Sequence, residues 1–332
     1  MKYGFHQFAG LAARVAGTML LSAGVALSAH AQTRIIVGST VSTDVSAAAL
    51  ALAMKDGSFK RAGLDVQLKN FVQSNQKYDT FKAGAIDVDI NMGAINAAQL
   101  YSSGVPLQVL RAATPADIWA VVTPTASPLK VPADLKGKRY GVVSLSGTNY
   151  GATYAALKLV NVDLMRDVKV STLPPSAILL ALGKNDIDAA TLYEPYLTPA
   201  IQSGRVKVMF KPDDLYRSHY KEPFLALVIA ARKDFVTKNQ AAAAKFVDVM
   251  EQAMARLADN TDAAATALTE VMPEIKLTPA QVKELLLPYI PNIIKTPNDP
   301  ATIKIAQNLY DRMLEARQLR SPVKASEFWI KL

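Results

Sequence analysis

A strand, a loop and a helix occur twice in the same order, and this repeat most constrains what the chain can fold into. The first copy spans 35–54 and the second 140–159, and each breaks at a loop rich in Gly, Ser and Thr. An Ile-Asp pair follows each copy, with Asp87 in the first and Asp188 in the second. Helix N-termini preceded by such loops favour bound anions and hydrogen-bond acceptors. The repeat therefore predicts two similar α/β lobes that clamp one ligand.

The pattern between and after these copies predicts the rest of the fold. Short apolar runs alternate with helical stretches from 34 to 110 and again from 135 to 209, which is typical of βαβ units and a mainly parallel sheet. The apolar run at 224–230 predicts a buried central strand, and the chain is helical in pattern from 239 onward. We expect an α/β fold of two lobes, with mixed, mainly parallel sheets flanked by helices and a ligand cleft between the lobes.

The chain is expected to cross between the lobes twice, near 119–127 and 220–228, which makes a two-segment hinge. This assigns 32–122 and 227–332, with the C-terminal helices, to the first lobe, and 123–226 to the second lobe.

The first residues have the layout of a cleaved export signal. Lys2 and Arg14 precede an apolar run at 15–27, and an Ala-x-Ala triplet at 29–31 stands before Gln32. The alternative is a membrane anchor, but the run is shorter than the ~20 residues that a spanning helix needs. We expect a signal peptide at 1–31 and a periplasmic protein. The chain has no Cys, so neither a disulfide nor a lipid attached to Cys is expected.

The net charge of +9 comes from basic residues scattered among acidic ones. No Lys/Arg stripe is interleaved with aromatic residues, so nucleic acid is not an expected partner. The basic excess supports only a bias toward anionic small molecules, and we expect a monomer.

The first lobe should present polar side chains where its strands end, because ligands of open α/β sheets bind beyond the carboxyl ends of the strands. Hydroxyls and carboxylates there can contact a ligand or merely cap the next helix. The candidates after the first strand are Ser39, Thr40, Ser42, Thr43 and Asp44, and those at the end of a later strand are Asn91, Gly93, Ala94 and Asn96. Weaker candidates are Ser74 and Asn75, which begin a helix, and Arg111, which can pair with an anionic group.

The second lobe has the best single site signal, a loop of exposed donors at a helix start. This loop supplies Ser146, Gly147, Thr148 and Asn149. Tyr193 and Glu194 follow another strand and should face the same cleft, where Glu194 either accepts hydrogen bonds from a ligand or caps a helix. Trp119, near the first crossing, either stacks on a planar ligand or packs in the core.

Four stretches in order along the chain carry a resemblance to a known family. The run at 56–66 resembles the G-x-F-x-x-x-G-L-D-V signature of the nitrate/sulfonate/taurine-type solute-binding proteins of ABC importers. The stretches at 134–138, 146–148 and 188–196 resemble the family's entry to the second lobe, its helix-capping loop and its D-A-x-x-x-x-E-P segment. The resemblance implies a type II periplasmic-binding fold that traps one small molecule and delivers it to a membrane permease.

Members of this family bind oxyanions or sulfonates, and others bind pyrimidine-like or aromatic compounds. The site loops combine hydroxyls with aromatic groups and lack a cationic cluster, which favours a small organic anion of the sulfonate or aromatic carboxylate type. Two alternatives share the fold. One is a ligand-binding sensor or adaptor for a membrane receptor, and the other is an enzyme, as in a desulfinase or a pyrimidine synthase.

The residue types disfavour catalysis. The desulfinase uses a Cys nucleophile and the pyrimidine synthase draws on His, whereas this chain has no Cys and, after residue 31, only His219. No spacing of metal ligands and no phosphate-binding loop occurs. We therefore predict a binding protein without enzymatic activity, cofactor or metal.

Overall fold

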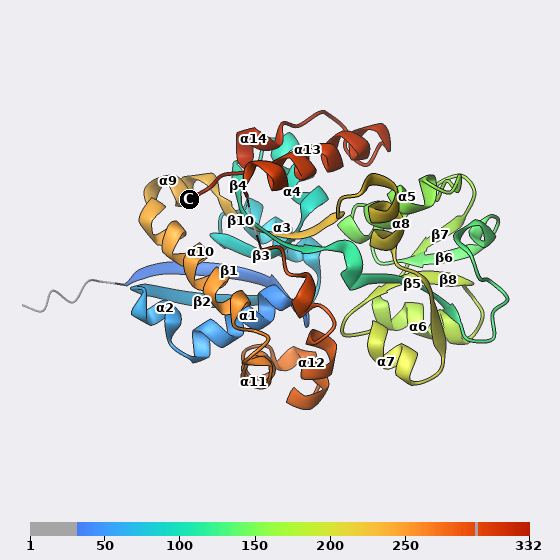
Figure 1. Cartoon of the computed structure of the whole chain (residues 1–332), viewed down its shortest axis with the longest axis horizontal. Coiled ribbons are helices and arrows are strands. Elements are labelled where there is room, and N and C mark those ends of the chain that lie inside the picture. Colours follow the sequence, from blue (N-terminus) through green and yellow to red (C-terminus); the bar gives the residue numbers. More distant parts are fainter. Residues whose placement is uncertain (1–31, 296–297) are drawn as a thin grey trace, which may run out of the picture. The chain divides into compact units, whose positions relative to one another are not determined.

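Two five-stranded sheets organise the computed structural model, which describes residues 32–295 and 298–332 (Figure 1). The expected signal peptide at 1–31 lies outside the described residues. The first sheet has the order β2 (Leu64–Phe71), β1 (Thr33–Thr40), β3 (Val88–Gly93), β10 (Leu225–Arg232) and β4 (Leu107–Pro115). The second has the order β7 (Lys169–Thr172), β6 (Arg139–Val142), β8 (Ala189–Tyr193), β5 (Trp119–Pro124) and β9 (Val206–Phe210).

The two sheets share one topology. In the first, β1 pairs in parallel with β2 and β3, while β10 pairs antiparallel with β3 and β4. In the second, β6 pairs in parallel with β7 and β8, while β5 pairs antiparallel with β8 and β9. In each sheet the single opposed strand is the one by which the chain enters from the other sheet. We call the part built on the first sheet the first lobe and the part built on the second sheet the second lobe.

Asp87 and Asp188 explain why the repeat is visible in the sequence. The Asp87 carboxylate accepts a hydrogen bond from the backbone of Ile36 at 2.9 Å, and the Asp188 carboxylate accepts one from the backbone of Arg139 at 2.8 Å. Each aspartate thus binds the strand next to its own, at equivalent places in β1 and β6. The repeated residue performs the same structural task in both lobes.

Helices cover both sheets. In the second lobe, α5 (Thr148–Lys158), α6 (Pro175–Gly183), α7 (Leu197–Gln202) and α8 (Pro212–Tyr220) contact its strands. Helices α1 (Val45–Lys55), α3 (Ser74–Lys82), α4 (Ala94–Ser102), α9 (Lys233–Lys238), α13 (Pro300–Glu315) and α14 (Ala325–Phe328) contact the first sheet. Around α1 pack α2 (Ser58–Arg61), α10 (Gln240–Ala255), α11 (Thr261–Val271) and, through α11, α12 (Pro279–Leu286). Short 3₁₀ helices are η1 (Ala116–Ile118), η2 (Pro132–Leu135), η3 (Pro273–Ile275) and η4 (Ile290–Asn292).

Sheet membership differs slightly from the predicted lobe limits. The limit after 122 falls inside β5, and all of β5 pairs with strands of the second sheet. Residues 225–226, assigned to the second lobe, begin β10 of the first sheet. The crossings therefore precede each opposed strand, with η1 between β4 and β5 and residues 221–224 between α8 and β10. The lobe limits themselves stay predictions.

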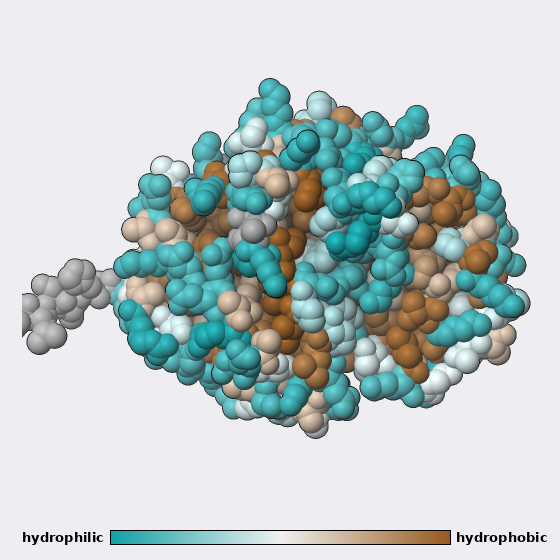
Figure 2. Space-filling view, viewed as in Figure 1, coloured by the Kyte–Doolittle hydropathy of each residue, from teal (hydrophilic) through white to brown (hydrophobic). Residues whose placement is uncertain are grey.

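The largest cluster of the core continues from the first lobe into the second, where Ala152, Ala155 and Tyr216 belong to it. One large cluster of buried apolar residues surrounds the first sheet and the C-terminal helices, and two smaller clusters lie in the second lobe. Figure 2 shows a face that is mostly hydrophilic, with hydrophobic residues gathered near the middle of the view and over α6. Within 32–295 and 298–332, no helix has both the length and the apolar character needed to cross a membrane.

A buried ion pair lies under the strand ends of the first lobe. Lys77 of α3 and Asp89 of β3 are both fully buried, and Lys77 Nζ donates to Asp89 Oδ1 at 2.8 Å. Lys77 Nζ also donates to the backbone oxygen of Asn91 at 3.1 Å and to its Oδ1 at 2.6 Å. Because an isolated charge is costly to bury, these acceptors are what permit the lysine to sit there.

Replacing Lys77 by Met should destabilise the protein by about 3–5 kcal/mol, since Asp89 would then carry an uncompensated buried charge. The matched control is Lys82→Met, whose partner Asp79 is exposed, with an expected effect of about 0–1 kcal/mol. Urea unfolding measures both. Adding Asp89→Asn to Lys77→Met should recover part of the loss, and equal losses in the two single variants would contradict the interpretation.

Candidate functional site

A cleft of about 480 Å³ lies where strand ends of both sheets come together. Its walls include residues that follow β1, β2 and β3 of the first lobe and β6, β7 and β8 of the second. The opposed strands contribute their beginnings, with Trp119 from β5 and Leu227 near the start of β10. This is where open α/β sheets place ligands.

Most of the predicted site residues line this cleft. They are Thr40, Ser42, Thr43, Asn91, Gly93, Asn96, Trp119, Gly147, Thr148, Asn149, Tyr193 and Glu194, together with Asp44 and the weaker candidates Ser74 and Asn75. That they contact a ligand stays a prediction. The structure brings them to one place from segments far apart in the sequence.

Three predicted residues and Arg111 lie elsewhere. Ser39 is fully buried beneath the cleft, where its hydroxyl accepts from Asn91 Nδ2, and Ala94 is fully buried in α4. Ser146 is exposed, although its carbonyl takes part in a contact described below. Arg111 does not line the cleft. Its guanidinium donates to the backbone oxygens of Ala112 and Ile294 and so links β4 to the segment that follows η4.

Several residues that line the cleft are not among the candidates predicted from the sequence. Tyr78, Tyr196 and Tyr289 line the cleft, as do Leu227 and the segment 172–176. Residues 172–176 follow β7 and were within reach of the strand-end argument. Tyr289 follows α12, far along the chain from any predicted loop, and no local pattern indicated it.

Asn91 forms the floor of the cleft on the first lobe. Its Oδ1 accepts from the backbone of Thr40 at 3.0 Å as well as from Lys77, and its Nδ2 donates to Asp44 Oδ2 at 2.9 Å. Asp44 Oδ1 in turn accepts from the backbone of Ser46 and Ala47 and caps α1. The amide therefore fixes the loop after β1 against the buried ion pair, and Asp44 acts as a helix cap.

Thr43 differs from its neighbours on this loop. Its side chain is fully buried, and its Oγ1 has no hydrogen-bond partner within the described residues, yet Thr43 lines the cleft. A buried hydroxyl without a partner costs free energy unless a ligand or water completes its hydrogen bonds.

Asn96 of α4 connects the two lobes across the cleft. Thr148 Oγ1 donates to Asn96 Oδ1 at 3.0 Å, and Asn96 Nδ2 donates to the backbone oxygen of Ser146 at 2.8 Å. Tyr78 OH also donates to Asn96 Oδ1, at 3.3 Å. Asn96 thus holds the start of α5 against the first lobe.

Glu194 makes a second connection. Its Oε1 accepts from Thr198 Oγ1 at 2.5 Å and from Tyr289 OH at 3.2 Å, and its Oε2 accepts from the backbone of Thr198 at 3.2 Å. Burial raises the pKa of the Glu194 carboxyl above its ordinary value, and the hydrogen bonds from Thr198 oppose part of the rise. The carboxylate therefore caps α7 and reaches the C-terminal part of the chain at the same time.

Five aromatic residues line the cleft, namely Tyr78, Trp119, Tyr193, Tyr196 and Tyr289. Trp119 is 6% exposed and belongs to the apolar core, as one interpretation expected, and its stacking on a ligand stays a prediction. Tyr193 and Tyr196 meet edge to face, with ring centroids 5.9 Å apart. Such faces can stack on a planar group or attract a cation.

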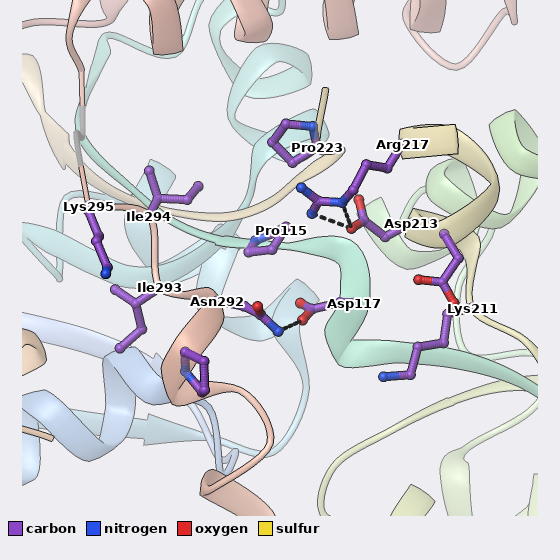
Figure 3. A pocket seen from close by; sticks show the side chains of 12 residues that line it. Pro115, Asp117, Lys211, Asp213, Arg217, Pro223, Asn292, Ile293, Ile294 and Lys295 are labelled. Carbon is purple, nitrogen blue, oxygen red and sulfur yellow. Dashed lines mark hydrogen bonds and ion pairs between the residues drawn. The ribbon is translucent and has the colours of Figure 1, made fainter. Parts of the chain in front are cut away.

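A second cavity, of about 610 Å³, lies outside the cleft, beside the segments by which the chain passes between the lobes (Figure 3). Asp117 of η1 and Asn292 of η4 point toward each other there, and Asn292 Nδ2 donates to Asp117 Oδ2. Asp213 accepts from Arg217 and from the backbone of Phe224. These contacts join the connecting segments, so the cavity belongs to the hinge.

Burial raises the pKa of Asp117 to about 6, and the nearby charge of Asp213 adds to the rise. Asp117 is 9% exposed, and its Oδ1 has no hydrogen-bond partner within 32–295 and 298–332. The hinge thus contains a carboxyl group whose charged form is disfavoured in the folded protein.

No group of three or more His, Cys, Asp or Glu side chains suited to a metal ion occurs in the part of the chain that the structure describes. His219 is exposed on α8 and contacts the ring of Tyr220.

Comparisons with known proteins agree with this geometry. The model of the family described as NMT1/THI5 like matches residues 45–264. The taurine-binding periplasmic protein of Escherichia coli K12 is 29% identical over 205 residues, and the alignment covers 61% of this chain and 61% of that protein. The chain thus aligns with about three fifths of the length of this curated relative.

Solved structures show the fold. The alkanesulfonate-binding protein SsuA of Xanthomonas axonopodis pv. citri, bound to MOPS, matches with a TM-score of 0.73 at 18% identity, over 90% of this chain and 99% of that one. The aliphatic sulphonate binding protein SsuA of Escherichia coli also matches with 0.73, at 19% identity, over 89% and 97%. The predicted periplasmic-binding fold is confirmed.

Gly93→Ala should loosen the contact between the lobes. A Cβ at Gly93 would stand 2.5 Å from Asn96 Oδ1 and 2.9 Å from Thr148 Cβ, and closer still to Thr148 Oγ1, so the pair must separate. Small-angle scattering of the unliganded protein should give a larger radius than that of the parent, with the melting temperature nearly unchanged. Gly183→Ala, where a Cβ meets nothing within 4 Å, is the control and should match the parent. An unchanged radius in Gly93→Ala would show that the Asn96 contact does not hold the lobes together.

Asp117→Asn should stabilise the protein more at neutral than at acid pH. Because the pKa of about 6 in the folded protein lies above the ordinary value of 3.8, ionised Asp117 opposes folding, and this penalty grows as pH rises through that window. Asn removes the penalty and keeps an acceptor for Asn292. We expect a gain of about 1–2 kcal/mol at pH 7 relative to the gain at pH 4.5, measured by urea unfolding at both values. A gain independent of pH would contradict the assignment.

Proposed function

The chain belongs to the NMT1/THI5-like family, and on this premise we propose that it is an extracytoplasmic solute-binding protein that captures a small organic molecule and delivers it to an ABC importer. The observation that carries the proposal is the cleft itself, which is lined from both lobes and bridged by Asn96 and Thr148. A ligand that contacts both walls stabilises the closed arrangement, and a permease can distinguish the closed form from the open form.

The relatives support the role without fixing the ligand. Taurine and alkanesulfonate are bound by proteins similar to this one, and the hydroxyls of Thr40, Ser42 and Thr43 suit an oxyanion. A small organic anion, as expected from the sequence, is therefore one candidate class. Docking to a permease, the monomeric state and export through cleavage after Ala31 are parts of the same proposal, the last resting on the Ala-x-Ala triplet.

The proposal includes binding without turnover. The relatives named above are binding proteins, and the two carboxylates among the cleft side chains, Asp44 and Glu194, accept hydrogen bonds from the backbone at helix starts. A sensor that passes its ligand's signal to a membrane receptor would use the same cleft. A permease and an ATPase encoded beside this chain would favour transport over sensing.

Compounds released by denaturing the purified protein, identified by mass spectrometry, should be small organic molecules present in about equimolar amount. Each compound, added back in excess for many hours, should be recovered unchanged, and scattering should show the protein becoming more compact. Conversion of the compound would overturn the binding role in favour of an enzyme. Release of no compound, together with no thermal shift from a metabolite library, would overturn solute binding altogether.

A further inference from the structure

The charged side chains that line the cleft are all acidic. Asp44 and Glu194 are the charged residues among those that line it, and they are 8% and 6% exposed. No Lys or Arg lines the cleft within 32–295 and 298–332. A ligand whose charge is only negative would enter beside two carboxylates with no positive side chain on the walls.

The cation beneath the floor does not change this balance. Lys77 is fully buried, and its Nζ already donates to Asp89 and to two oxygens of Asn91. It does not line the cleft, and its charge is matched by that of Asp89. The Lys77–Asp89 pair is therefore nearly neutral as seen from the cleft, so the charged side chains on its walls are Asp44 and Glu194, beside the backbone N–H groups at the starts of α1 and α5.

The two carboxylates are not equivalent. Asp44 uses Oδ1 for two backbone N–H groups of α1 and Oδ2 for the Asn91 amide, so it is occupied as a cap. Glu194 Oε2 accepts one hydrogen bond, from the backbone of Thr198. A carboxylate oxygen has two acceptor positions, so Glu194 Oε2 retains one for a donor on a ligand.

The rings near Glu194 suit the same kind of group. Tyr193 precedes it, Tyr196 meets Tyr193 edge to face, and Tyr289 donates to Glu194 itself. Trp119 pairs with Tyr193 in the sheet register of β5 and β8 and also lines the cleft. A carboxylate flanked by aromatic faces attracts an ammonium group by charge, by hydrogen bonding and by cation–π contact.

We infer that the solute of this cleft carries an ammonium group, which pairs with Glu194 among the rings of Tyr193, Tyr196 and Trp119. The inference rests on the proposed solute-binding function and narrows it. A zwitterion fits, with its anionic end toward Thr40 and Ser42, which line the cleft on the first lobe. A simple organic anion lacks the group that Glu194 accepts, so this inference departs from the anionic class that the sequence favoured.

Matched pairs of compounds that differ only in the amine test the inference on the intact mature protein. The pairs are taurine with ethanesulfonate, 4-(aminomethyl)benzoate with 4-methylbenzoate, and 2-phenylethylamine with 2-phenylethanol. Calorimetry or thermal shift should show that, in any pair that binds, the ammonium member binds about ten- to a hundred-fold more tightly, the value of one hydrogen bond between charged groups. Equal or tighter binding of the amine-free member would overturn the inference.

Glu194→Gln separates the role of the charge from that of the fold. Gln keeps one acceptor oxygen, but its NH2 group replaces an oxygen that accepts from Thr198, so we expect a modest fall in the melting temperature. The preference for the ammonium member should disappear. Glu284→Gln, an exposed site on α12, removes the same charge outside the cleft and should keep the preference. An unchanged preference in Glu194→Gln would overturn the assignment of the residue.

The two proposals fail in different ways. If anions bind and compact the protein without regard to an amine, solute binding stands and the ammonium inference falls. If mass spectrometry finds no released compound and no member of the pairs or of the library binds, the solute-binding proposal itself falls.

Discussion

The buried ammonium of Lys77 is the interaction on which the first-lobe wall of the cleft depends. A charge with no exposure must find acceptors, and those within reach are Asp89 and the two oxygens of Asn91. Asn91, held in this way, presents the remaining atoms of its amide to the Thr40 backbone and to Asp44, and Asp44 begins α1. One ion pair therefore orders a strand end, a loop and a helix start, and gives the ligand a rigid surface to meet.

The parts of the fold that the sequence predicts are those with local chemistry. Strand and helix positions follow from the period of apolar residues, and the equivalence of the lobes follows from a repeated Ile-Asp whose aspartate binds the neighbouring strand in both. The limit at 122–123 is where the prediction departs from sheet membership. Trp119 to Val122 are apolar and would suit either lobe, and only their pairing with β8 and β9 assigns them to the second sheet.

The residues that line the cleft are partly predictable for the same reason, and the prediction misses some of them at identifiable points. Residues at strand ends were found because a sheet gathers those ends at one edge. Ser39 and Thr40 show what is lost, since adjacent residues of a strand point to opposite faces and the sequence does not say which one meets the cleft. Tyr289 and Tyr78 come from helical parts of the chain, and their place in the cleft depends on how those segments return to it. Asn96 stays a predicted ligand contact, and the structure adds partners for its side chain on the other lobe, which no local pattern indicated.

Asn96 makes two uncharged hydrogen bonds between the lobes at the cleft, while Arg312 of α13 forms an ion pair with Glu222. The contacts at the cleft bear on how a carrier releases its solute. A neutral hydrogen bond contributes about 0.5–1.5 kcal/mol net, so the contacts of Asn96 with Thr148 and Ser146 add only modestly to the stability of the closed arrangement. A ligand then shifts the population by its differential contacts with the two walls. Glu194 is placed to link the two effects, because its carboxylate accepts from Tyr289 and has room for a donor from the solute. A donor that orders this carboxylate also orders the contact across the cleft, so recognition and closure would depend on one side chain. Departure of the solute weakens both together.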